Sequence, residues 1–378
     1  MSYINSIEKA IIVFPFIALL FTIPFILHQY HKYGSIHKLR VFIIYSFILY
    51  LISIYFLVIL PLPKLETVVW KPDMIRLVPF TFILDFIKET SFVICNPSTY
   101  LKALLEPCVY TVAFNLFMFV PLGMYLRYYF KCDFKHVLGY SFLLSFFFEI
   151  TQLTGLYFMY PYPYRIFDVD DLLINTLGGL LGYSFMGIFS RFLPTRDRID
   201  KEAFQIGKQV SGFRRITVFG LDFATYSIIS LVVFLFGNTK LFLIIFVIYY
   251  GIIPLLSNGK TLGSQFLNVS FETPNMKFIR ILLRHIILYF YYFGIPIGII
   301  YGVVYFINKI NPNSATSILI CFLGLLFIFL FYIINFIWLI KRKNRFYDTL
   351  LQTTYQSTIV ENKKNEIDNS LDNRYHKD

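Results

Sequence analysis

The stretch that decides the class of protein lies at residues 315–340 and reads ATSILICFLGLLFIFLFYIINFIWLI, 26 residues without one charged side chain. About 20 apolar residues in a helix cross the roughly 30 Å of hydrocarbon in a bilayer. The backbone finds no water there, so such a run is expected to be helical. Similar runs recur along the 378 residues, of which only 15% are charged, against about 25% in soluble domains. We therefore expect an all-α, polytopic integral membrane protein.

Nine spans are predicted, five in the first half of the chain and four in the second. They cover about 10–30, 40–62, 110–130, 136–156, 171–193, 216–237, 240–257, 284–307 and 315–340. Lys and Arg gather in alternate connections. Residues 191–215 hold seven basic and three acidic side chains, whereas Arg165 is the only Lys or Arg in the connection before the fifth span. Since cytoplasmic loops carry the excess of Lys and Arg, this pattern places the N-terminus outside and the C-terminus in the cytoplasm.

A polar segment divides the chain into two halves. We expect a membrane domain over 1–195, a cytoplasmic linker over 196–211, a second membrane domain over 212–355 and a disordered cytoplasmic tail over 356–378. Within the first domain, the 63–109 connection is too polar for a span, and its 77–87 stretch suits an interfacial or re-entrant helix. Cys95 and Cys108 share this connection, and a disulfide between them is an open alternative.

The net charge of +12 would suggest nucleic acid as a partner of a soluble protein. Here the basic residues flank apolar runs, so membrane topology and anionic lipid explain them better. We expect membrane lipids as partners and no nucleic acid. The four cysteines lack the CxxC spacing of zinc sites, and the histidines are scattered. Neither a metal nor a cofactor is expected.

Polar side chains gather at the predicted outer ends of the third, fourth and fifth spans. Ionisable groups at such depth are costly and usually face a partner or a cavity. The candidate ligand-binding residues are Asn115, Glu149, Gln152, Arg165, Asp168, Asp170, Asp171 and Asn175. The alternative is structural, with Asp170 capping a helix and Arg165 pairing with Asp168. We expect Gly178, Gly179 and Gly182 to serve helix packing.

A second polar cluster lies on the predicted cytoplasmic side of the other half. Its members are Arg215, Asp222, Arg284 and Asp348. Seven residues separate Arg215 from Asp222, about two helical turns, so both lie on one face. An Asp within a span needs a partner, and we expect Arg284 or Arg215 to be that partner. The structural alternative is a set of ion pairs and topology anchors without further function.

The outer residues belong to four motifs that occur in order along the first half. These are Leu77-Val-Pro-Phe80, Asn115-Leu-Phe-Met-Phe-Val-Pro-Leu-Gly123, the stretch from Ser145 to Gln152, and Arg165-Ile-Phe-Asp-Val-Asp-Asp-Leu-Leu-Ile-Asn-Thr-Leu-Gly-Gly-Leu-Leu-Gly182. Together they resemble the VanZ-like family over roughly 1–195. The resemblance implies a bacterial envelope protein, and the founding members of the family lower sensitivity to teicoplanin without a defined chemical activity. One departure is Arg76-Leu, where an Asn-Leu pair is usual.

The second half resembles another family, the RDD family, over about 210–355. Three motifs carry this resemblance: Gly212-Phe-Arg-Arg-Ile-Thr-Val-Phe-Gly-Leu-Asp222, Gly259-Lys-Thr-Leu-Gly263 and Arg345-Phe-Tyr-Asp348. The family is named for an Arg and two Asp, which here match Arg215, Asp222 and Asp348. The resemblance implies transport, with sodium/proton antiport in some members. Ser264 and Tyr347 depart from the family pattern.

Three functions follow from these features. The first is a non-enzymatic protein of the bacterial cell membrane whose outer cleft binds a lipid-linked envelope precursor or an amphiphilic antibiotic. The second is a carrier in which Glu149 and Asp222 titrate. The third is an enzyme on an envelope lipid that uses the outer carboxylates as acid and base or with a divalent cation. No HExxH motif, nucleophile elbow or phosphate-binding loop accompanies the cluster, so no catalytic residue is assigned.

Overall fold

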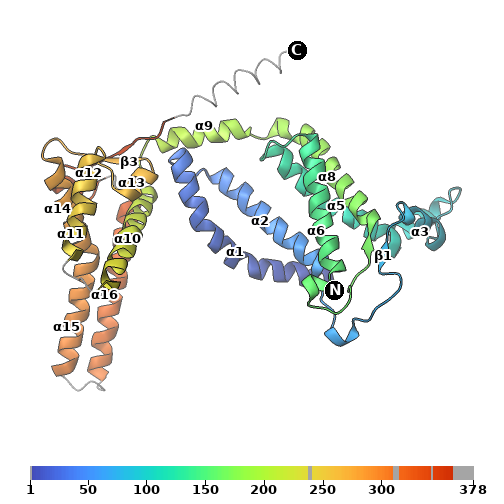
Figure 1. Cartoon of the computed structure of the whole chain (residues 1–378), viewed down its shortest axis with the longest axis horizontal. Helices are drawn as coiled ribbons and strands as arrows, with labels where there is room; N and C mark the ends of the chain where they lie inside the picture. Colours follow the sequence, from blue (N-terminus) through green and yellow to red (C-terminus); the bar gives the residue numbers. More distant parts are fainter. Residues whose placement is uncertain (1, 237–240, 310–314, 342–343, 361–378) are drawn as a thin grey trace, which may run out of the picture. The chain divides into compact units, whose positions relative to one another are not determined.

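The computed structural model describes residues 2–236, 241–309, 315–341 and 344–360. Helices make up nearly all of its regular structure (Figure 1). The predicted disordered tail lies outside the described residues from 361 onward. Its first residues, by contrast, form the end of a short strand.

Seven helical segments among the described residues are long and apolar enough to cross a bilayer, as a polytopic membrane protein requires. They are Ser6–Tyr33, Lys38–Ile59, Pro107–Tyr128, Val169–Phe192, Gly212–Leu235, Lys277–Lys309 and Ala315–Leu339. Each coincides with a predicted span. The predicted 136–156 span corresponds to a helix, Phe134–Leu153, that is not among these seven. The predicted 240–257 span corresponds to a shorter apolar helix, Leu241–Leu256. The count of nine and the sidedness remain predictions.

The chain forms two compact units, residues 1–22 with 38–199 and residues 23–37 with 200–378. The first unit contains the start of α1 (Ser2–Tyr33), α2 (Lys38–Ile59), η1 (Leu65–Thr67), β1 (Ile75–Arg76), α3 (Thr81–Glu89), η2 (Pro97–Thr99), α4 (Tyr100–Leu104), α5 (Pro107–Tyr128), α6 (Phe134–Leu153), α7 (Gly155–Phe158), β2 (Phe167–Asp168), α8 (Val169–Phe189), η3 (Ser190–Phe192) and the start of α9 (Arg196–Gly207). The linker expected at 196–211 is therefore mostly helical.

Glycines bring α5 and α8 into backbone contact. A Cβ atom added to Gly178 or Gly182 would lie 2.1 Å from the Leu116 carbonyl oxygen or 1.9 Å from that of Val120. Gly123 makes the reciprocal approach from α5, where a Cβ would lie 1.8 Å from the Gly179 carbonyl oxygen. Small residues permit such close helix packing in membranes. The prediction that the α8 glycines serve packing is confirmed.

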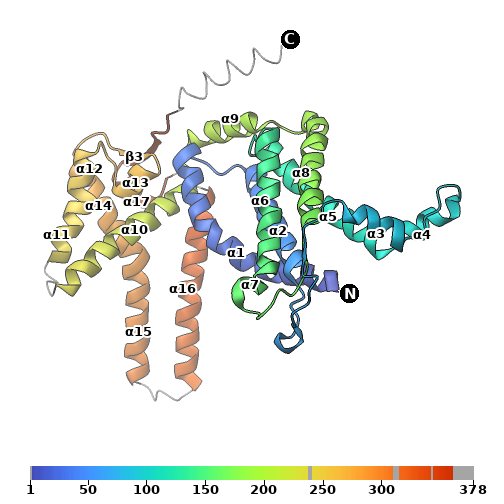
Figure 2. The same ribbon diagram turned by 45° about the vertical axis from the view of Figure 1, so that its right-hand side comes forward.

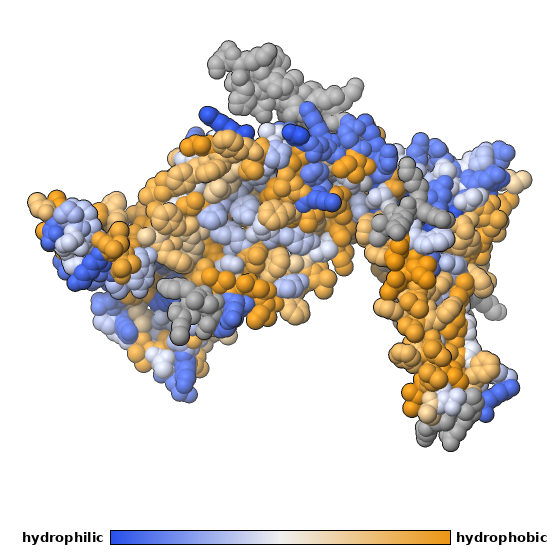
Figure 3. Space-filling model, turned by 180° about the vertical axis from the view of Figure 1, so that it is seen from behind, coloured by the Kyte–Doolittle hydropathy of each residue, from blue (hydrophilic) through white to orange (hydrophobic). Residues whose placement is uncertain are grey.

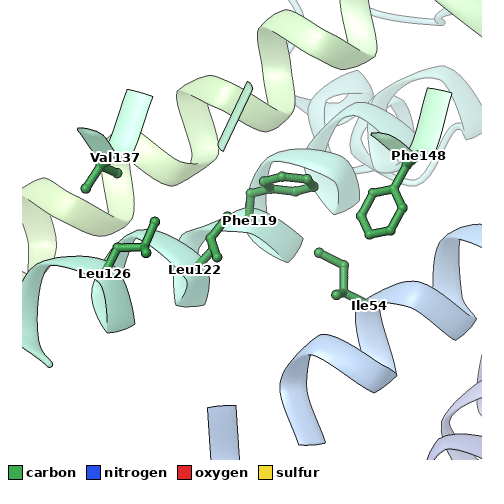
Figure 4. Packing of buried hydrophobic residues seen from close by; sticks show 6 residues of the cluster. All are labelled: Ile54, Phe119, Leu122, Leu126, Val137 and Phe148. Atoms are coloured by element: carbon green, nitrogen blue, oxygen red, sulfur yellow. The ribbon is translucent and has the colours of Figure 1, made fainter. Parts of the chain in front are cut away.

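A hydrophobic cluster joins α2, α5 and α6 beside this contact (Figure 4). Phe119 and Leu122 of α5, Ile54 of α2 and Phe148 of α6 belong to it, and all four are almost fully buried. Phe119 and Phe148 meet edge to face, with ring centroids 6.3 Å apart. This cluster fixes the ends of α2, α5 and α6 relative to one another.

The connection at 63–109 contains a short strand and a helix that the all-α prediction described only in part. β1 pairs in parallel with β2, with Arg76 opposite Asp168. The helix expected within 77–87 is present as α3, whose apolar side chains are largely exposed. The four cysteines are free, so Cys95 and Cys108 form no disulfide here.

The second unit is also mainly helical and contains the end of α1. Its remaining elements are the end of α9, α10 (Gly212–Leu235), α11 (Leu241–Val247), the π-helical turn η4 (Ile248–Ile252), α12 (Ile253–Leu256), α13 (Leu262–Phe266), β3 (Val269–Glu272), α14 (Lys277–Tyr289), the π-helical turn η5 (Phe290–Gly294), α15 (Ile295–Lys309), α16 (Ala315–Lys341), α17 (Phe346–Leu350) and β4 (Thr354–Ser357). Figure 2 shows α15 and α16 as long neighbouring helices. Apolar side chains cover their surface (Figure 3).

An antiparallel ladder closes the other end of this unit. β3 pairs with β4, so that Phe271 lies opposite Tyr355. Leu267 and Val269 pack with Tyr30 of α1 and Val218 of α10 in a second buried cluster. This ladder is the other departure from the all-α prediction, and it carries the segment after α16 back toward the start of α10.

Replacing Gly182 by Ala should destabilise the first unit. The added methyl group would collide with the Val120 carbonyl, and such overpacking costs about 1–3 kcal/mol of unfolding free energy. A lower thermal midpoint of the purified protein in detergent would show it. Gly139→Ala on α6 is the matched control, because its Cβ would meet no atom within 4 Å. Equal midpoints for the two variants would contradict the backbone contact.

Candidate functional site

A hollow of about 430 Å³ lies where α2 and α6 end and where α5 and α8 begin. Six of the eight residues predicted from the sequence line it. They are Asn115, Glu149, Gln152, Arg165, Asp171 and Asn175. The four helix ends meet at one level, as the alternating directions of the predicted spans require. We call this hollow the polar pocket.

Asp171 and Asn175 extend one face of α8 beyond its packing glycines. The Asn115 side-chain amide on α5 donates to Asp171 Oδ1 at 2.7 Å. The Asn175 amide donates to Ser145 Oγ on α6 at 2.9 Å, and that hydroxyl donates to the Asp171 carbonyl oxygen at 3.3 Å. Three helices thus contribute to one hydrogen-bonded network. Asn175 Oδ1 is buried and accepts no hydrogen bond within the described part of the chain.

Glu149 is 3% exposed, and its Oε2 accepts the backbone N–H of Asp168 at 3.0 Å. Arg165 donates to the carbonyl oxygens of Val58 and Leu60 at 2.6 and 3.1 Å. Gln152 donates to the same Val58 oxygen at 3.2 Å. The last carbonyls of a helix have no partner within the helix, so Arg165 and Gln152 satisfy the end of α2. They also form one wall of the polar pocket.

Asp168 and Asp170 do not line the polar pocket. Asp170 accepts the backbone N–H groups of Phe80 and Phe82 at 2.5 and 3.0 Å and the Thr81 hydroxyl at 2.7 Å. It therefore holds the start of α3, which lies about 90 residues earlier in the sequence. In the structural interpretation, Asp170 was predicted to cap a helix. It does so, but the helix is α3 and not α8, to which Asp170 belongs.

Asp168 is the cap of α8, because its Oδ1 accepts the Asp170 backbone N–H at 2.9 Å. The expected pair of Asp168 with Arg165 is wrong. Asp168 instead lies 3.9 Å from Arg76, which also approaches Asp85 at 3.4 Å. Burial raises the pKa of Asp168, while the Asp170 N–H and the Arg76 charge act against that rise. Arg165 instead bonds to the carbonyls at the end of α2, which the sequence did not indicate.

The polar pocket combines polar and apolar walls. Two carboxylates, Glu149 and Asp171, face it together with the unpartnered Asn175 Oδ1. Leu57, Phe114 and Met118 supply apolar surface. Acceptor oxygens of this kind suit hydroxyl, amide or ammonium donors on a ligand. No group of three His, Cys, Asp or Glu side chains arranged for a metal ion is found in the described ranges.

The sequence model of the family described as VanZ/LLP1 matches residues 47–190. Residues 47–190 are a VanZ/LLP1 family domain. The match includes α5, α6, α8 and every residue of the polar pocket. No curated protein and no solved structure matched the chain. The family match includes no part of the second unit, and the RDD resemblance there stays a prediction.

Within the VanZ/LLP1 domain, two contributions to the site were not foreseen from the sequence. Val58 supplies the carbonyl that both Arg165 and Gln152 contact, and Ser145 links Asn175 to α8. Ser145 begins the 145–152 motif, and its residue type alone does not indicate this contact. Nothing in the local sequence marks Val58, because its contribution is a backbone oxygen at a helix end.

The second unit contains the other predicted cluster. In it, Asp222 is bound by hydroxyl groups and a backbone N–H and not by an arginine. Asp222 Oδ1 accepts the Tyr249 hydroxyl at 2.9 Å and the Gly263 N–H at 2.7 Å. Its Oδ2 accepts the Thr261 hydroxyl at 2.6 Å. The prediction that Arg284 or Arg215 is the partner of Asp222 is therefore wrong. The motif at 259–263 folds over α10 so closely that a Cβ on Gly263 would lie 2.7 Å from Asp222 Oδ1.

Arg284 pairs with Asp348 instead. Arg284 Nε donates to Asp348 Oδ1 at 2.8 Å, and both side chains are almost fully buried. The guanidinium also contacts the rings of Phe271, Tyr347 and Tyr355, at 4.6 to 5.3 Å from their centroids. Burial raises the pKa of Tyr355 to about 12, with Arg284 opposing the rise. The predicted cluster thus separates into an Asp222 cage and an Arg284–Asp348 pair.

Arg215 joins neither arrangement through a hydrogen bond. Its guanidinium lies over the Tyr355 ring, 4.2 Å from the centroid. Its Nε and Nη1 atoms are buried and have no acceptor in the part of the protein that the structure describes. Three further residues contact this cluster and were not predicted from the sequence. Tyr249 and Thr261 donate to Asp222, and Tyr355 lies against Arg215.

Replacing Asp170 by Ala should release the start of α3 while leaving the polar pocket in place. Hydrogen bonds to charged groups contribute about 1.5–3 kcal/mol, so amide hydrogen exchange around Phe80 and Phe82 should accelerate roughly tenfold or more. Exchange measured by mass spectrometry over 75–90 would test this. Asp73→Ala, at an exposed position of the same connection, is the control. Unchanged exchange in the Asp170 variant would rule out the proposed capping.

Proposed function

We propose that the VanZ/LLP1 domain binds the polar part of an amphiphilic molecule of the bacterial cell envelope in the polar pocket. By this binding the protein alters susceptibility to teicoplanin-type lipoglycopeptides. A lipid-linked envelope precursor or the antibiotic itself is the candidate ligand. The protein acts in this proposal as a binding protein and not as an enzyme.

The observation that carries the proposal is the juxtaposition of Glu149 and Asp171 in a hollow of about 430 Å³. Membrane helices seldom carry ionisable groups unless a partner or a cavity requires them. Neither acid forms an ion pair with a described basic residue at 4.0 Å or less. Their hydrogen bonds come from one backbone N–H and one amide, so each retains acceptor capacity toward a ligand.

The shape of the pocket also suits an amphiphile. Leu57, Phe114 and Met118 form an apolar wall beside the acids, and α5 is a candidate membrane span. A lipid-linked molecule would place its polar group against the acceptors and its chain along such a wall. The expected outward position of this end of the helices follows from the distribution of Lys and Arg.

Antibiotic susceptibility tests this proposal in a Gram-positive host that expresses the full chain. Teicoplanin tolerance should rise while vancomycin tolerance changes little. Glu149→Gln and Asp171→Asn should each abolish the effect, because loss of a charged hydrogen bond costs about 1.5–3 kcal/mol, or roughly tenfold or more in affinity. The matched controls are Glu66→Gln and Asp73→Asn, at exposed positions of the same domain. Full tolerance in correctly inserted pocket variants would refute the proposal.

The second candidate function is transport of ions or small solutes by the second unit, as the RDD resemblance implies. The observation that favours it is Asp222, a buried carboxylate inside the candidate span Gly212–Leu235. Two hydroxyl groups and one backbone N–H surround it. Such an acid can gain and lose a proton without breaking an ion pair, which is a property that proton-coupled carriers use.

Flux measurements on proteoliposomes test the second candidate. An imposed proton or sodium gradient should drive counter-ion movement through the full chain, and Asp222→Asn should abolish it. Glu272→Gln, at an exposed position in the same unit, should leave the flux unchanged. The absence of any gradient-dependent flux from correctly folded protein would exclude this function while leaving the polar pocket proposal untouched.

A further inference from the structure

A second hollow, of about 490 Å³, lies within the second unit and outside the VanZ/LLP1 domain. Residues of α10, α14, α16 and α17 line it, together with Tyr355 of β4. Its walls are mainly aromatic and aliphatic, including Phe219 and Phe329. Two arginines, Arg215 and Arg345, are the only charged side chains among the lining residues. We call this hollow the arginine pocket.

Both guanidinium groups are buried and incompletely bonded. Arg215 is 8% exposed and Arg345 is 6% exposed. Arg215 Nε and Nη1 and Arg345 Nε have no acceptor among the residues that the structure places. A buried charged donor without an acceptor carries a large desolvation cost. An anionic group in the hollow would remove that cost.

The neighbouring acid does not fill this role. Asp348 is the closest acid in sequence to Arg345, but its Oδ1 binds Arg284 Nε at 2.8 Å and its Oδ2 accepts the Arg345 backbone N–H at 3.2 Å. Arg345 Nη2 donates to the Asn335 carbonyl, and Arg215 lies over the Tyr355 ring, 4.2 Å from its centroid. Each guanidinium group therefore has a protein contact that positions it. A fixed guanidinium fork matches the oxygen geometry of a phosphate group.

The position of the arginine pocket indicates where its ligand comes from. Arg215 lies in the first turn of α10, and Arg345 follows the end of α16. Both arginines thus lie at the ends of candidate membrane spans, at the depth expected for lipid headgroups. The apolar wall runs from there along the spans through Phe219 and Phe329.

Lining residues of α10 and α16 reach the surface of the protein. Ile216, Ile333 and Phe336 line the hollow and are 38%, 37% and 47% exposed. Since both helices are apolar enough to lie in a bilayer, these exposed side chains would face lipid. We propose that the arginine pocket binds an anionic phospholipid, with its phosphate between Arg215 and Arg345 and one acyl chain against Phe219 and Phe329. Basic pockets between membrane helices recognise anionic headgroups in this way.

Native mass spectrometry of the full-length protein in detergent tests the proposal with phosphatidylglycerol, phosphatidylcholine and oleate as probes. We expect one phosphatidylglycerol molecule to be retained in preference to phosphatidylcholine. Arg215→Gln and Arg345→Gln should each weaken retention by about tenfold or more, because each removes charged hydrogen bonds to the phosphate. Arg280→Gln is the matched control, since Arg280 bonds the Leu351 carbonyl and the Gln352 side chain and does not line the hollow.

Ile333→Trp keeps the test decisive if an arginine variant fails to fold. The larger side chain would occupy the hollow from a lipid-facing position without changing its charge, so phosphatidylglycerol retention should fall in a protein with an unchanged thermal midpoint. Equal retention of phosphatidylcholine and phosphatidylglycerol would overturn the proposal, as would retention of oleate in place of either phospholipid. Undiminished retention by folded Ile333→Trp would overturn it as well.

Discussion

The architecture of the VanZ/LLP1 domain depends on the contact between the backbones of α5 and α8. Gly123, Gly178 and Gly182 allow this contact because any larger residue would collide with a carbonyl group. Asp171 and Asn175 lie seven and three residues before Gly178, so the same helix face that packs through glycine presents them to Asn115 and Ser145. The polar pocket is thus the continuation of a packing interface beyond the point where small residues give way to polar ones.

The two units stabilise buried acidic side chains in different ways. In the first, Glu149 and Asp171 are held by neutral donors and border a cavity. In the second, Arg284 and Asp348 neutralise each other inside a shell of aromatic rings. Breaking a buried pair leaves an uncompensated charge, so that pair tolerates little change. The acids of the polar pocket accept from neutral donors, so a change there does not leave a buried charge of opposite sign without its partner.

The sequence predicted the features that depend on local composition. Seven of the predicted spans are long apolar helices in the structure, and Asn115, Glu149 and Asp171, which were expected at one depth, line one hollow. Contacts between segments that are distant in the sequence could not be predicted in this way. Asp170 binds a loop about 90 residues away, and Asp222 binds the 261–263 turn instead of an arginine. Both acids accept hydrogen bonds from backbone N–H groups and hydroxyls, and the sequence does not mark such groups as partners.

The same distinction explains why the arginine pocket could not be predicted from the sequence. The 212–222 motif and a helix spacing connect Arg215 with Asp222, whereas Arg345 belongs to the separate motif at 345–348. The β3–β4 ladder brings Tyr355 against Arg215 and Arg284 at once, but only Arg284 obtains a carboxylate. One acid shared among three nearby arginines leaves two guanidinium groups with unused donors. An excess of buried donors beside apolar walls therefore distinguishes this hollow from the polar pocket, where acceptors are in excess.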